Sequence, residues 1–417
     1  MKKINNLQGG KLSPLFCIKK FYFLCVLLLF SFYLFSQNIQ TDVKQDGNKK
    51  VDSNKYKQIE NVDDNENNKN EKNKSLREDF IQGLYLTAYK AATNDFHKIL
   101  DQAQEAGINT VVFDLKNMNG DVFFSMPQNS FLTNENLKPI IDIPKVVNVL
   151  HSRNMKAVSR VVMFHDEYNA ERDSTLRAAN SDGTAWVESE RRGPSWMDSS
   201  NPRVQEYLFS LIEQIAKSGV DEIQMDYVRF PTQGHSGDAI FYFQREDYEY
   251  ARYDSLYILR DRDDIILEFV KNVKAICDKY NVSLAADVFA IVAWQRNADI
   301  KSTGQNIGYL SKYLDKIHPM IYSSHFADNF SYRKNVPNEV YHLMYKGTKL
   351  TMEHAQSGCK VIPYIQANSW KVNYKEEYMH SQIQAIKDLG ASGYILWNSS
   401  NRYEKTLTWI KNFNYPN

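Results

Sequence analysis

The chain has 417 residues, of which 51 are Lys or Arg and 50 are Asp or Glu, so its formal net charge is +1. This balance lacks the basic excess of a nucleic-acid-binding surface, and we expect no nucleic-acid partner. Of the four cysteines, Cys17 and Cys25 lie in or before an N-terminal apolar segment, whereas Cys277 and Cys359 have no CxxC spacing and no histidine pair nearby. The cysteines therefore indicate neither a disulfide framework nor a metal site.

The chain begins with an arrangement typical of an export signal. Residues 1–20 are basic, residues 21–35 (FYFLCVLLLFSFYLF) form an uninterrupted apolar run, and the residues that follow are polar. The run is short for a membrane span, so export is the preferred interpretation. Phe35 and Ser36 do not form a clean small-x-small cleavage site, and an uncleaved membrane anchor over residues 1–36 is the alternative. Either way, we expect the folded domain outside the cytoplasm: periplasmic, secreted or membrane-anchored.

Residues 37–78 consist largely of Asn, Lys, Asp and Glu, with almost no large apolar side chains. A segment of this composition cannot bury enough surface to offset its chain entropy. We predict a disordered linker that leads into a folded domain of residues 79–417.

From residue 83 onward, an amphipathic helix, a turn-forming break and a short β-rich run recur in this order. Pro202 after Asn201 suits the start of one such helix. Eight β-rich runs result: GLYLTAY, INTVVFDLK, MKAVSRVVMF, VDEIQMDYVRF, VSLAADVFAI, KIHPMIYSS, KVIPYIQANS and SGYILWNSS.

Amphipathic spacing supports the helices between these runs. The expected buried faces are Phe96, Ile99, Leu100, Ala103 and Ala106 in residues 95–107, and Val204, Leu208, Leu211 and Ile215 in residues 202–219.

Strands that alternate with helices pair in parallel through right-handed crossovers. The chain is long enough for two average domains or for one large α/β domain. Eight β–α units in roughly 340 residues predict one (β/α)₈ TIM barrel with long loops after strands three and four. A doubly wound open sheet is the alternative, but its first strand would need a glycine-rich phosphate loop where this chain has TAYKAATND.

Alternate residues of a strand face opposite sides, and this alternation gives each predicted strand an outward and an inward set. The apolar set should face the helices, so the mixed set should face the barrel axis. The outward sets are Val111, Phe113 and Leu115 in the second strand, Ile223, Met225 and Tyr227 in the fourth, and Leu284, Ala286 and Val288 in the fifth. The inward sets are Thr110, Val112, Asp114 and Lys116, then Gln224, Asp226 and Val228, then Ser283, Ala285 and Asp287.

Three aspartates thus point inward near the C-terminal ends of their strands: Asp114, Asp226 and Asp287. In (β/α)₈ barrels this end carries the active site, so charged residues there are typical of catalysis. The structural alternative is a buried ion pair in which Asp226 binds Arg160 or Arg229.

Paired carboxylates on neighbouring strands suit glycoside hydrolysis, because the leaving oxygen needs a proton and the oxocarbenium-like centre needs a nearby negative charge. Adjacent strands lie about 4.8 Å apart. That spacing favours the roughly 5.5 Å carboxylate separation of retaining enzymes, and the slightly wider separation of inverting enzymes is the alternative. We expect Asp226 to act as nucleophile or charge stabiliser and Asp287 as acid/base, with Asp114 holding a sugar hydroxyl.

Aromatic side chains near the predicted strand ends suit a carbohydrate substrate, because sugars present apolar faces that stack on rings. Core packing is the commoner fate of any single tryptophan. The tryptophans expected to line the mouth are Trp186, Trp196, Trp294, Trp370 and Trp397. The candidate substrate-binding residues are Asp114, Arg160, His165, Arg229, Trp294, Tyr322, Gln366 and Trp397.

Two long insertions, residues 165–202 and 232–264, follow the third and fourth strands. Segments of this length often form lids or binding surfaces, so we expect them to form one wall of a cleft, with a helical excursion on the barrel as the alternative for the second. His165 and His325 could contact substrate. No HxH, HExxH or G-x-S-x-G motif occurs, and we expect no metal, no cofactor and no nucleophilic serine.

From about Ile81 to the C-terminus the chain resembles a family of bacterial exported barrels catalogued as glycoside hydrolases. The motifs that carry the resemblance are GLYLTAY, VVFDLKN, RVVMFHD, SWMDSSNPRVQEYL, DEIQMDYVRFP, LAADVFA, HPMIYSSHF and GYILWNSS, of which DYVRFP is the most specific. The family is similar to amylase-like and galactosidase-like barrels, in which an aspartate that ends the fourth strand is the nucleophile. The resemblance implies this role for Asp226. It places Asp287 at the acid/base position of the fifth strand, where amylase-like enzymes have glutamate.

The preferred hypothesis is therefore a glycoside hydrolase that acts on a polysaccharide or glycan outside the cytoplasm. A non-catalytic carbohydrate-binding or envelope protein is the alternative, and a sugar isomerase or lyase is a weaker one. A catalytic pair should show one carboxyl with a raised pKa, whereas two carboxylates both held by arginine would favour binding alone.

Overall fold

A computed structural model describes residues 80–414, apart from residues 190, 192, 327–335 and 371–372. The predicted signal or anchor (1–36) and the predicted linker (37–78) lie outside the described residues. Within the described part of the chain, no helix is both long and apolar enough to cross a membrane.

Nine parallel strands form one sheet, in the order β7-β6-β5-β4-β3-β2-β1-β9-β8. Their bounds are Ile81–Leu86 (β1), Thr110–Lys116 (β2), Lys156–Val162 (β3), Glu222–Asp226 (β4), Ser283–Val288 (β5), Lys316–Pro319 (β6), Lys360–Val361 (β7), Tyr364–Gln366 (β8) and Gly393–Trp397 (β9).

The sheet closes through β7 and β8, which are two parts of the seventh strand. Only Ile362 and Pro363 separate them, and a proline cannot donate a ladder hydrogen bond. β7 pairs with β6, β8 pairs with β9, and a parallel bridge joins Met320 to Tyr364. This closure confirms the predicted (β/α)₈ barrel over the open-sheet alternative.

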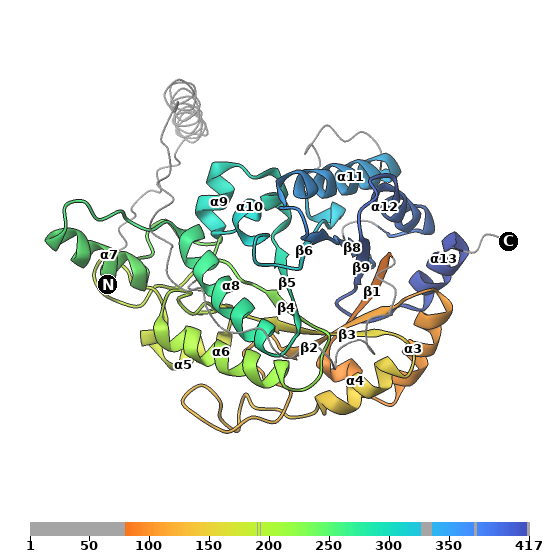
Figure 1. Ribbon diagram of the computed structural model, residues 1–417, viewed down its shortest axis with the longest axis horizontal. Coiled ribbons are helices and arrows are strands. Elements are labelled where there is room, and N and C mark those ends of the chain that lie inside the picture. Colours follow the sequence, from red (N-terminus) through yellow and green to blue (C-terminus); the bar gives the residue numbers. More distant parts are fainter. Residues whose placement is uncertain (1–79, 190, 192, 327–335, 371–372, 415–417) are drawn as a thin grey trace, which may run out of the picture. The chain divides into compact units, whose positions relative to one another are not determined.

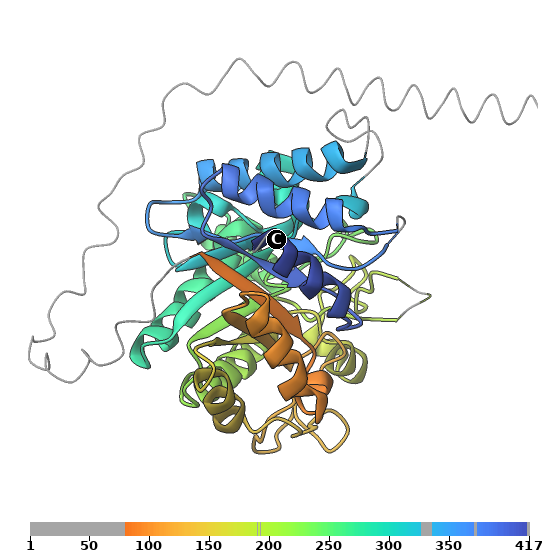
Figure 2. The ribbon, with the colours of Figure 1, turned by 90° about the vertical axis from the view of Figure 1, so that its right-hand side faces the viewer.

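Helices surround the sheet on its outer side (Figure 1), and a view turned by 90° shows them flanking the tilted strands (Figure 2). Their bounds are Ala88–Ala91 (α2), Asp95–Glu105 (α3), Ile143–His151 (α4), Glu167–Arg172 (α5), Pro202–Ala216 (α6), Tyr242–Tyr253 (α7), Arg262–Lys279 (α8), Asn297–Thr303 (α9), Ile307–Leu310 (α10), Val336–His354 (α11), Glu376–Asp388 (α12) and Glu404–Asn414 (α13).

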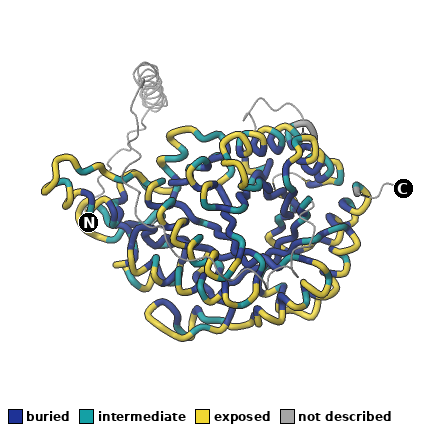
Figure 3. The backbone as a smooth tube through the Cα atoms, in the orientation of Figure 1, coloured by how far each residue is buried: buried dark blue, intermediate teal, exposed yellow. Residues whose placement is uncertain are grey.

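Local sequence explains where α6 begins and which face it buries. The Asn201 side chain accepts a hydrogen bond from the Arg203 backbone N–H, and Pro202 occupies the first helical turn, as predicted. The predicted faces of α3 and α6 are buried against the sheet. The tube in Figure 3 shows the resulting pattern, with buried strands at the centre and exposed residues on the outer helices.

Two hydrophobic cores hold the barrel together. The outer core lies between strands and helices and includes the outward residues predicted for β2 and β5. The inner core fills the barrel axis and consists of Ile81, Tyr85, Val112, Val158, Tyr322, Ile362, Tyr364 and Ile395.

The predicted alternation was wrong at the end of the fourth strand. Tyr227 has φ +52°, a left-handed conformation, so strand alternation stops at Asp226. As a result Val228, predicted to face the axis, packs in the outer core, while Tyr227 lines the cavity at the barrel mouth.

A buried ion pair lies at the N-terminal end of the barrel. Glu222 at the start of β4 pairs with Lys316 of β6, and His318 lies 3.6 Å from the same carboxylate. Although burial opposes ionisation, the charge of Lys316 and the contact with His318 lower the pKa of Glu222 to about 2.

Gly393 should be essential where β9 meets β1. Its φ is +144°, and a Cβ there would lie 2.1 Å from the Ile81 carbonyl oxygen. We expect Gly393→Ala to lower the free energy of unfolding by about 2 to 4 kcal/mol, because it adds a clash to an unfavourable backbone conformation. Urea denaturation of the full chain measures this change.

Gly183→Ala is the matched control, since Gly183 has φ +84° with no atom within 4 Å of its Cβ position. It should cost only about 1 kcal/mol. Equal losses in the two variants would contradict the contact argument.

Candidate active site

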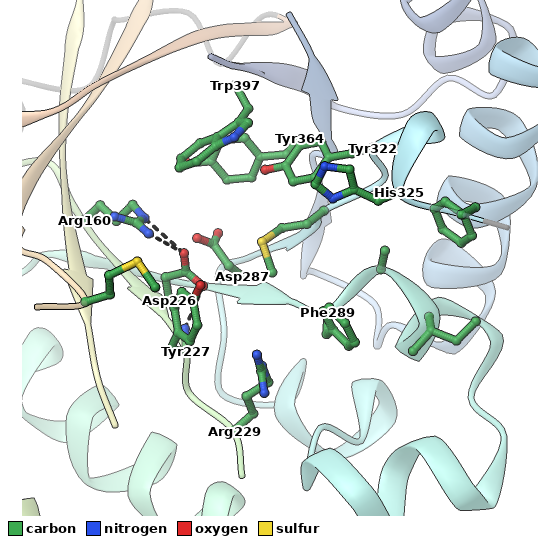
Figure 4. A pocket seen from close by; sticks show the side chains of 15 residues that line it. Arg160, Asp226, Tyr227, Arg229, Asp287, Phe289, Tyr322, His325, Tyr364 and Trp397 are labelled. Atoms are coloured by element: carbon green, nitrogen blue, oxygen red, sulfur yellow. Dashed lines mark hydrogen bonds and ion pairs between the residues drawn. The ribbon is translucent and has the colours of Figure 1, made fainter. Parts of the chain in front are cut away.

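A cavity of about 460 Å³ opens at the C-terminal ends of the strands. Its described lining comes from the residues after β2, β4, β5 and β6 and from side chains of β3, β4, β5, β8 and β9. The lining residues are Met118, Arg160, Asp226, Tyr227, Arg229, Asp287, Phe289, Ala290, Ile291, Met320, Tyr322, His325, Phe326, Tyr364 and Trp397 (Figure 4).

Arg160 on β3 bridges two of the three inward aspartates. Its Nη1 donates to Asp114 Oδ1 at 2.6 Å, and its Nη2 and Nε donate to Asp226 Oδ2 at 2.6 and 3.1 Å. The second oxygen of Asp226 accepts the Tyr227 backbone N–H at 2.6 Å. Asp226 is therefore a fully hydrogen-bonded carboxylate whose charge is paired with Arg160.

Asp114 bonds to Tyr85 of β1 as well as to Arg160. Its Oδ2 accepts a hydrogen bond of 2.6 Å from the Tyr85 hydroxyl, and the residue does not line the cavity wall. Burial raises the pKa of Asp114, opposed by the charge of Arg160 and by the bond from Tyr85. Asp114 thus holds Arg160 through their ion pair, and its contact with a sugar hydroxyl stays a prediction.

Asp287 at the end of β5 has a different environment. Both of its oxygens accept Gln224 Nε2, at 2.8 and 2.9 Å, and it forms no ion pair with any described basic residue. Burial and the neighbouring charge of Asp226 raise its pKa well above the usual range for an aspartate. Asp287 is therefore the carboxyl group of the two whose environment favours the protonated form.

The strand register brings Asp226 and Asp287 together. Met225 pairs with Ala286 in the β4–β5 ladder, so the next residues of both strands lie side by side. Figure 4 shows the two carboxylates adjacent at one end of the cavity. The cavity thus holds a paired carboxylate and a carboxyl of raised pKa on neighbouring strands.

Aromatic rings form the wall opposite β4 and β5. Trp397 on β9 stacks on Tyr85 with ring centroids 4.3 Å apart, and it also contacts Tyr322 and Tyr364. The Arg160 guanidinium lies 5.6 Å from the centre of the indole. Such a rigid ring beside two carboxyl groups is suited to hold the apolar face of a sugar.

The predicted site residues divide into two groups. Asp226, Asp287, Arg160, Arg229, Tyr322 and Trp397 line the cavity, while Asp114, His165, Trp294 and Gln366 do not.

The three further candidates away from the cavity have structural partners. His165 packs on Trp196 and Tyr227, and its Nδ1 lies 3.0 Å from the Met118 carbonyl oxygen. Burial lowers the pKa of His165 to about 4. Trp294 packs on Phe326, and Gln366 accepts the Ser324 hydroxyl.

The expectation of a mouth lined with several indoles was wrong, since Trp397 is the only tryptophan among the described lining residues. Trp186 and Trp196 are buried in the outer core, and Trp370 is exposed. The two insertions contribute no described lining residue, and the second contains helix α7, in agreement with the alternative prediction of a helical excursion.

Sequence reasoning missed the apolar part of the cavity. The missed residues are Met118, Tyr227, Phe289, Ala290, Ile291, Met320, Phe326 and Tyr364. Most of them directly follow a strand end, and this position in the sequence could have identified them as cavity-lining residues. Gln224, which holds Asp287, was in the inward set but not among the candidates.

Comparison with known proteins places the chain in a family. Residues 83–403 match the family model described as "Putative glycosyl hydrolase domain". The chain belongs to this family, DUF4015. Membership identifies the reaction class as hydrolysis of glycosidic bonds. No curated protein sequence matches the chain.

Solved glycosidase structures share the fold of this DUF4015 member. The glycoside hydrolase domain of PgaB (BpsB) from Bordetella bronchiseptica aligns with a TM-score of 0.55 and 12% identity, over 81% of this chain and 99% of that one. The β-amylase catalytic domain from Paenibacillus polymyxa gives 0.51 and 11%, over 81% and 98%. The α-L-fucosidase isoenzyme 2 from Paenibacillus thiaminolyticus gives 0.52 and 13%, over 80% and 48%.

Removal of Arg160 should destabilise the barrel in a pH-dependent way. Arg160→Met leaves Asp114 and Asp226 buried without their cation, and we expect a loss of about 3 to 5 kcal/mol near pH 8. Unpaired buried carboxylates have folded-state pKa values above their unfolded values, so the variant loses stability as pH rises through that range. Urea unfolding at pH 5 and pH 8 should therefore show the smaller loss at pH 5.

Arg203→Met is the control, because the pair between Arg203 and Asp173 is exposed at the surface. It should change stability little at either pH. A loss in Arg160→Met that does not vary with pH would contradict a role based on charge.

Proposed function

We propose that this protein hydrolyses a polysaccharide or glycan outside the cytoplasm by a retaining mechanism with Asp226 as nucleophile and Asp287 as acid/base. The observation that carries the proposal is the unequal environment of the two adjacent carboxyl groups. Asp226 is paired with Arg160, whereas Asp287 has a raised pKa and no cation of its own. Unequal carboxyl groups of this kind are the usual basis for assigning an acid and a base.

The chemistry follows from these two states. Protonated Asp287 donates its proton to the glycosidic oxygen as the C–O bond breaks, and the Asp226 carboxylate bonds to the anomeric carbon. In the second step the Asp287 carboxylate takes a proton from water, and this water attacks the anomeric carbon and releases Asp226. Register-adjacent residues on neighbouring strands suit the short separation that this double displacement needs.

The cavity supports a sugar as the ligand. Its volume of about 460 Å³ lies in the range of small-molecule sites, and Trp397 offers a flat face beside Asp226 and Asp287. The N-terminal run of residues 21–35 supports an action outside the cytoplasm, because it has the composition of an export signal.

One feature favours catalysis over carbohydrate binding alone. A binding protein has no need for a carboxyl group without a cation at the end of its cavity, since both aspartates could be neutralised by arginine. Asp287 instead pairs with an amide, which fixes its position and leaves it free to exchange a proton.

Both carboxyl groups should be required for cleavage. We expect the full chain to release reducing ends from at least one member of a panel of envelope and plant polysaccharides. Asp226→Asn and Asp287→Asn should each lower the rate by at least about 10²- to 10⁴-fold, the range for a positioned acid or base.

Asp173→Asn, a substitution at a partly exposed residue outside the cavity lining, serves as the control and should keep full activity. No release by the wild-type chain from any polysaccharide would contradict the proposed function. Full activity in Asp226→Asn would remove that residue from the mechanism.

The loss of activity at alkaline pH, which forms the alkaline limb of the pH–rate profile, should follow the deprotonation of Asp287. Protonated Asp287 is the active form, so activity is lost as pH rises through its raised pKa. The hydrogen bond from Gln224 lowers the pKa of Asp287, and Gln224→Leu should therefore shift this limb to higher pH. A limb that stays in place or moves to lower pH in the variant, measured by initial rates, would contradict the assignment.

A further inference from the structure

Arg229, three residues after Asp226, is a buried cation without an acidic partner among the described residues. It is only 9% exposed and lines the same cavity as the two carboxyl groups. Its Nη1 donates to the Phe230 carbonyl oxygen at 3.0 Å, and this is its only hydrogen bond to a described residue. A guanidinium has five N–H donors, so most of its donor capacity is unused by the described protein.

Three aromatic rings surround this guanidinium. Its central carbon lies 4.7 Å from the ring centre of Trp196, 5.2 Å from that of Tyr227 and 5.0 Å from that of Phe289. Rings stabilise a cation through their faces and accept no hydrogen bonds in the plane of the guanidinium. Aromatic packing therefore holds Arg229 in place and leaves its N–H edge available.

The charges around the cavity do not neutralise Arg229. Asp226 is the nearest acid in sequence, but its oxygens accept Arg160 and the Tyr227 N–H. Glu188 influences Arg229 more weakly, and burial raises the pKa of its carboxyl. Burial also lowers the pKa of Arg229, which shows that its charge is poorly compensated. A buried cation of this kind is costly for stability and is retained when it binds an anion.

We propose that Arg229 binds an anionic group of the substrate, so that the glycan held in this cavity carries a carboxylate such as that of a uronic acid. The planar guanidinium fork matches a carboxylate with two parallel hydrogen bonds. This inference rests on the proposed function only in taking the cavity as the substrate site.

The position of Arg229 places the anion near the cleaved bond. Tyr227 and Phe289, two of the rings that hold it, directly follow the strand ends that carry Asp226 and Asp287. In Figure 4 the guanidinium extends toward the cavity from below these two carboxyl groups. An acidic sugar bound here would lie with its carboxylate on Arg229 while its ring lies in the cavity beside the carboxyl pair.

Pairs of acidic and neutral oligosaccharides test whether Arg229 binds an anionic group of the substrate. The full chain is titrated with a panel of uronic-acid oligosaccharides, each matched to the neutral oligosaccharide obtained by reducing its carboxyl groups to alcohols. Binding is followed by calorimetry, and reducing ends are measured in the same samples. The wild-type chain should bind at least one acidic oligosaccharide at least about tenfold more tightly than its neutral partner, the factor expected for a charged hydrogen-bonded contact.

Arg229→Gln should abolish this preference, so that the acidic and neutral partners bind equally, and Arg229→Lys should restore part of it. Arg262→Gln is the matched control. Arg262 also lies on two aromatic rings, Phe230 and Phe241, but it is not part of the cavity lining, so the preference should persist. A sulfated galactan oligosaccharide distinguishes a general anion site from a carboxylate site.

The outcomes separate this inference from the proposed function. Binding of no acidic oligosaccharide, equal binding of both partners by the wild-type chain, or an acidic preference that survives in Arg229→Gln would overturn the inference. Tighter binding of the sulfated oligosaccharide than of every uronic acid would overturn the choice of carboxylate. Acid-selective binding without release of reducing ends would instead count against hydrolysis and leave the role of Arg229 standing.

Discussion

The ion pairs of Arg160 are the interaction on which the site depends. Three aspartates approach the barrel axis from β2, β4 and β5, and one arginine on β3 lies between the first two. Arg160 pairs with Asp114 and Asp226, whereas Asp287 forms an ion pair with none of the described basic residues. One arginine therefore places chemically identical side chains in unequal environments: Asp226 is ion-paired, and burial with the charge of Asp226 raises the pKa of Asp287.

The same interior shows how a barrel can hold several charges in a small volume. Near its N-terminal end, Glu222 and Lys316 neutralise each other, and the inner hydrophobic core separates them from the mouth. The buried charged groups that lack a full set of protein partners thus lie at the C-terminal end, where a ligand can complete their interactions. Rigid strands hold these groups, so their positions do not depend on the long insertions.

The carboxyl group at the end of the fifth strand belongs to an aspartate and not to the longer glutamate. Asp287 is one methylene shorter, so its carboxyl group stays close to the strand and is only 1% exposed. Gln224 from β4 and Tyr364 from β8 meet beside it, since Gln224 Nε2 also donates to the Tyr364 hydroxyl at 2.6 Å. Gln224 fixes the shorter side chain in position, while burial and the charge of Asp226 raise its pKa.

The sequence by itself determined the barrel and the inward direction of Asp114, Asp226 and Asp287, because both depend on local order: helices alternate with strands, and strand residues alternate in direction. It did not predict the turn at Tyr227, since a left-handed residue other than glycine leaves no clear local signal. Only the tertiary structure decided which aspartate Arg160 binds, that Arg229 lacks an acid among the described residues, and that Trp397 is the indole at the cavity. Those outcomes depend on contacts between strands far apart in the chain, and residue order alone does not specify such contacts.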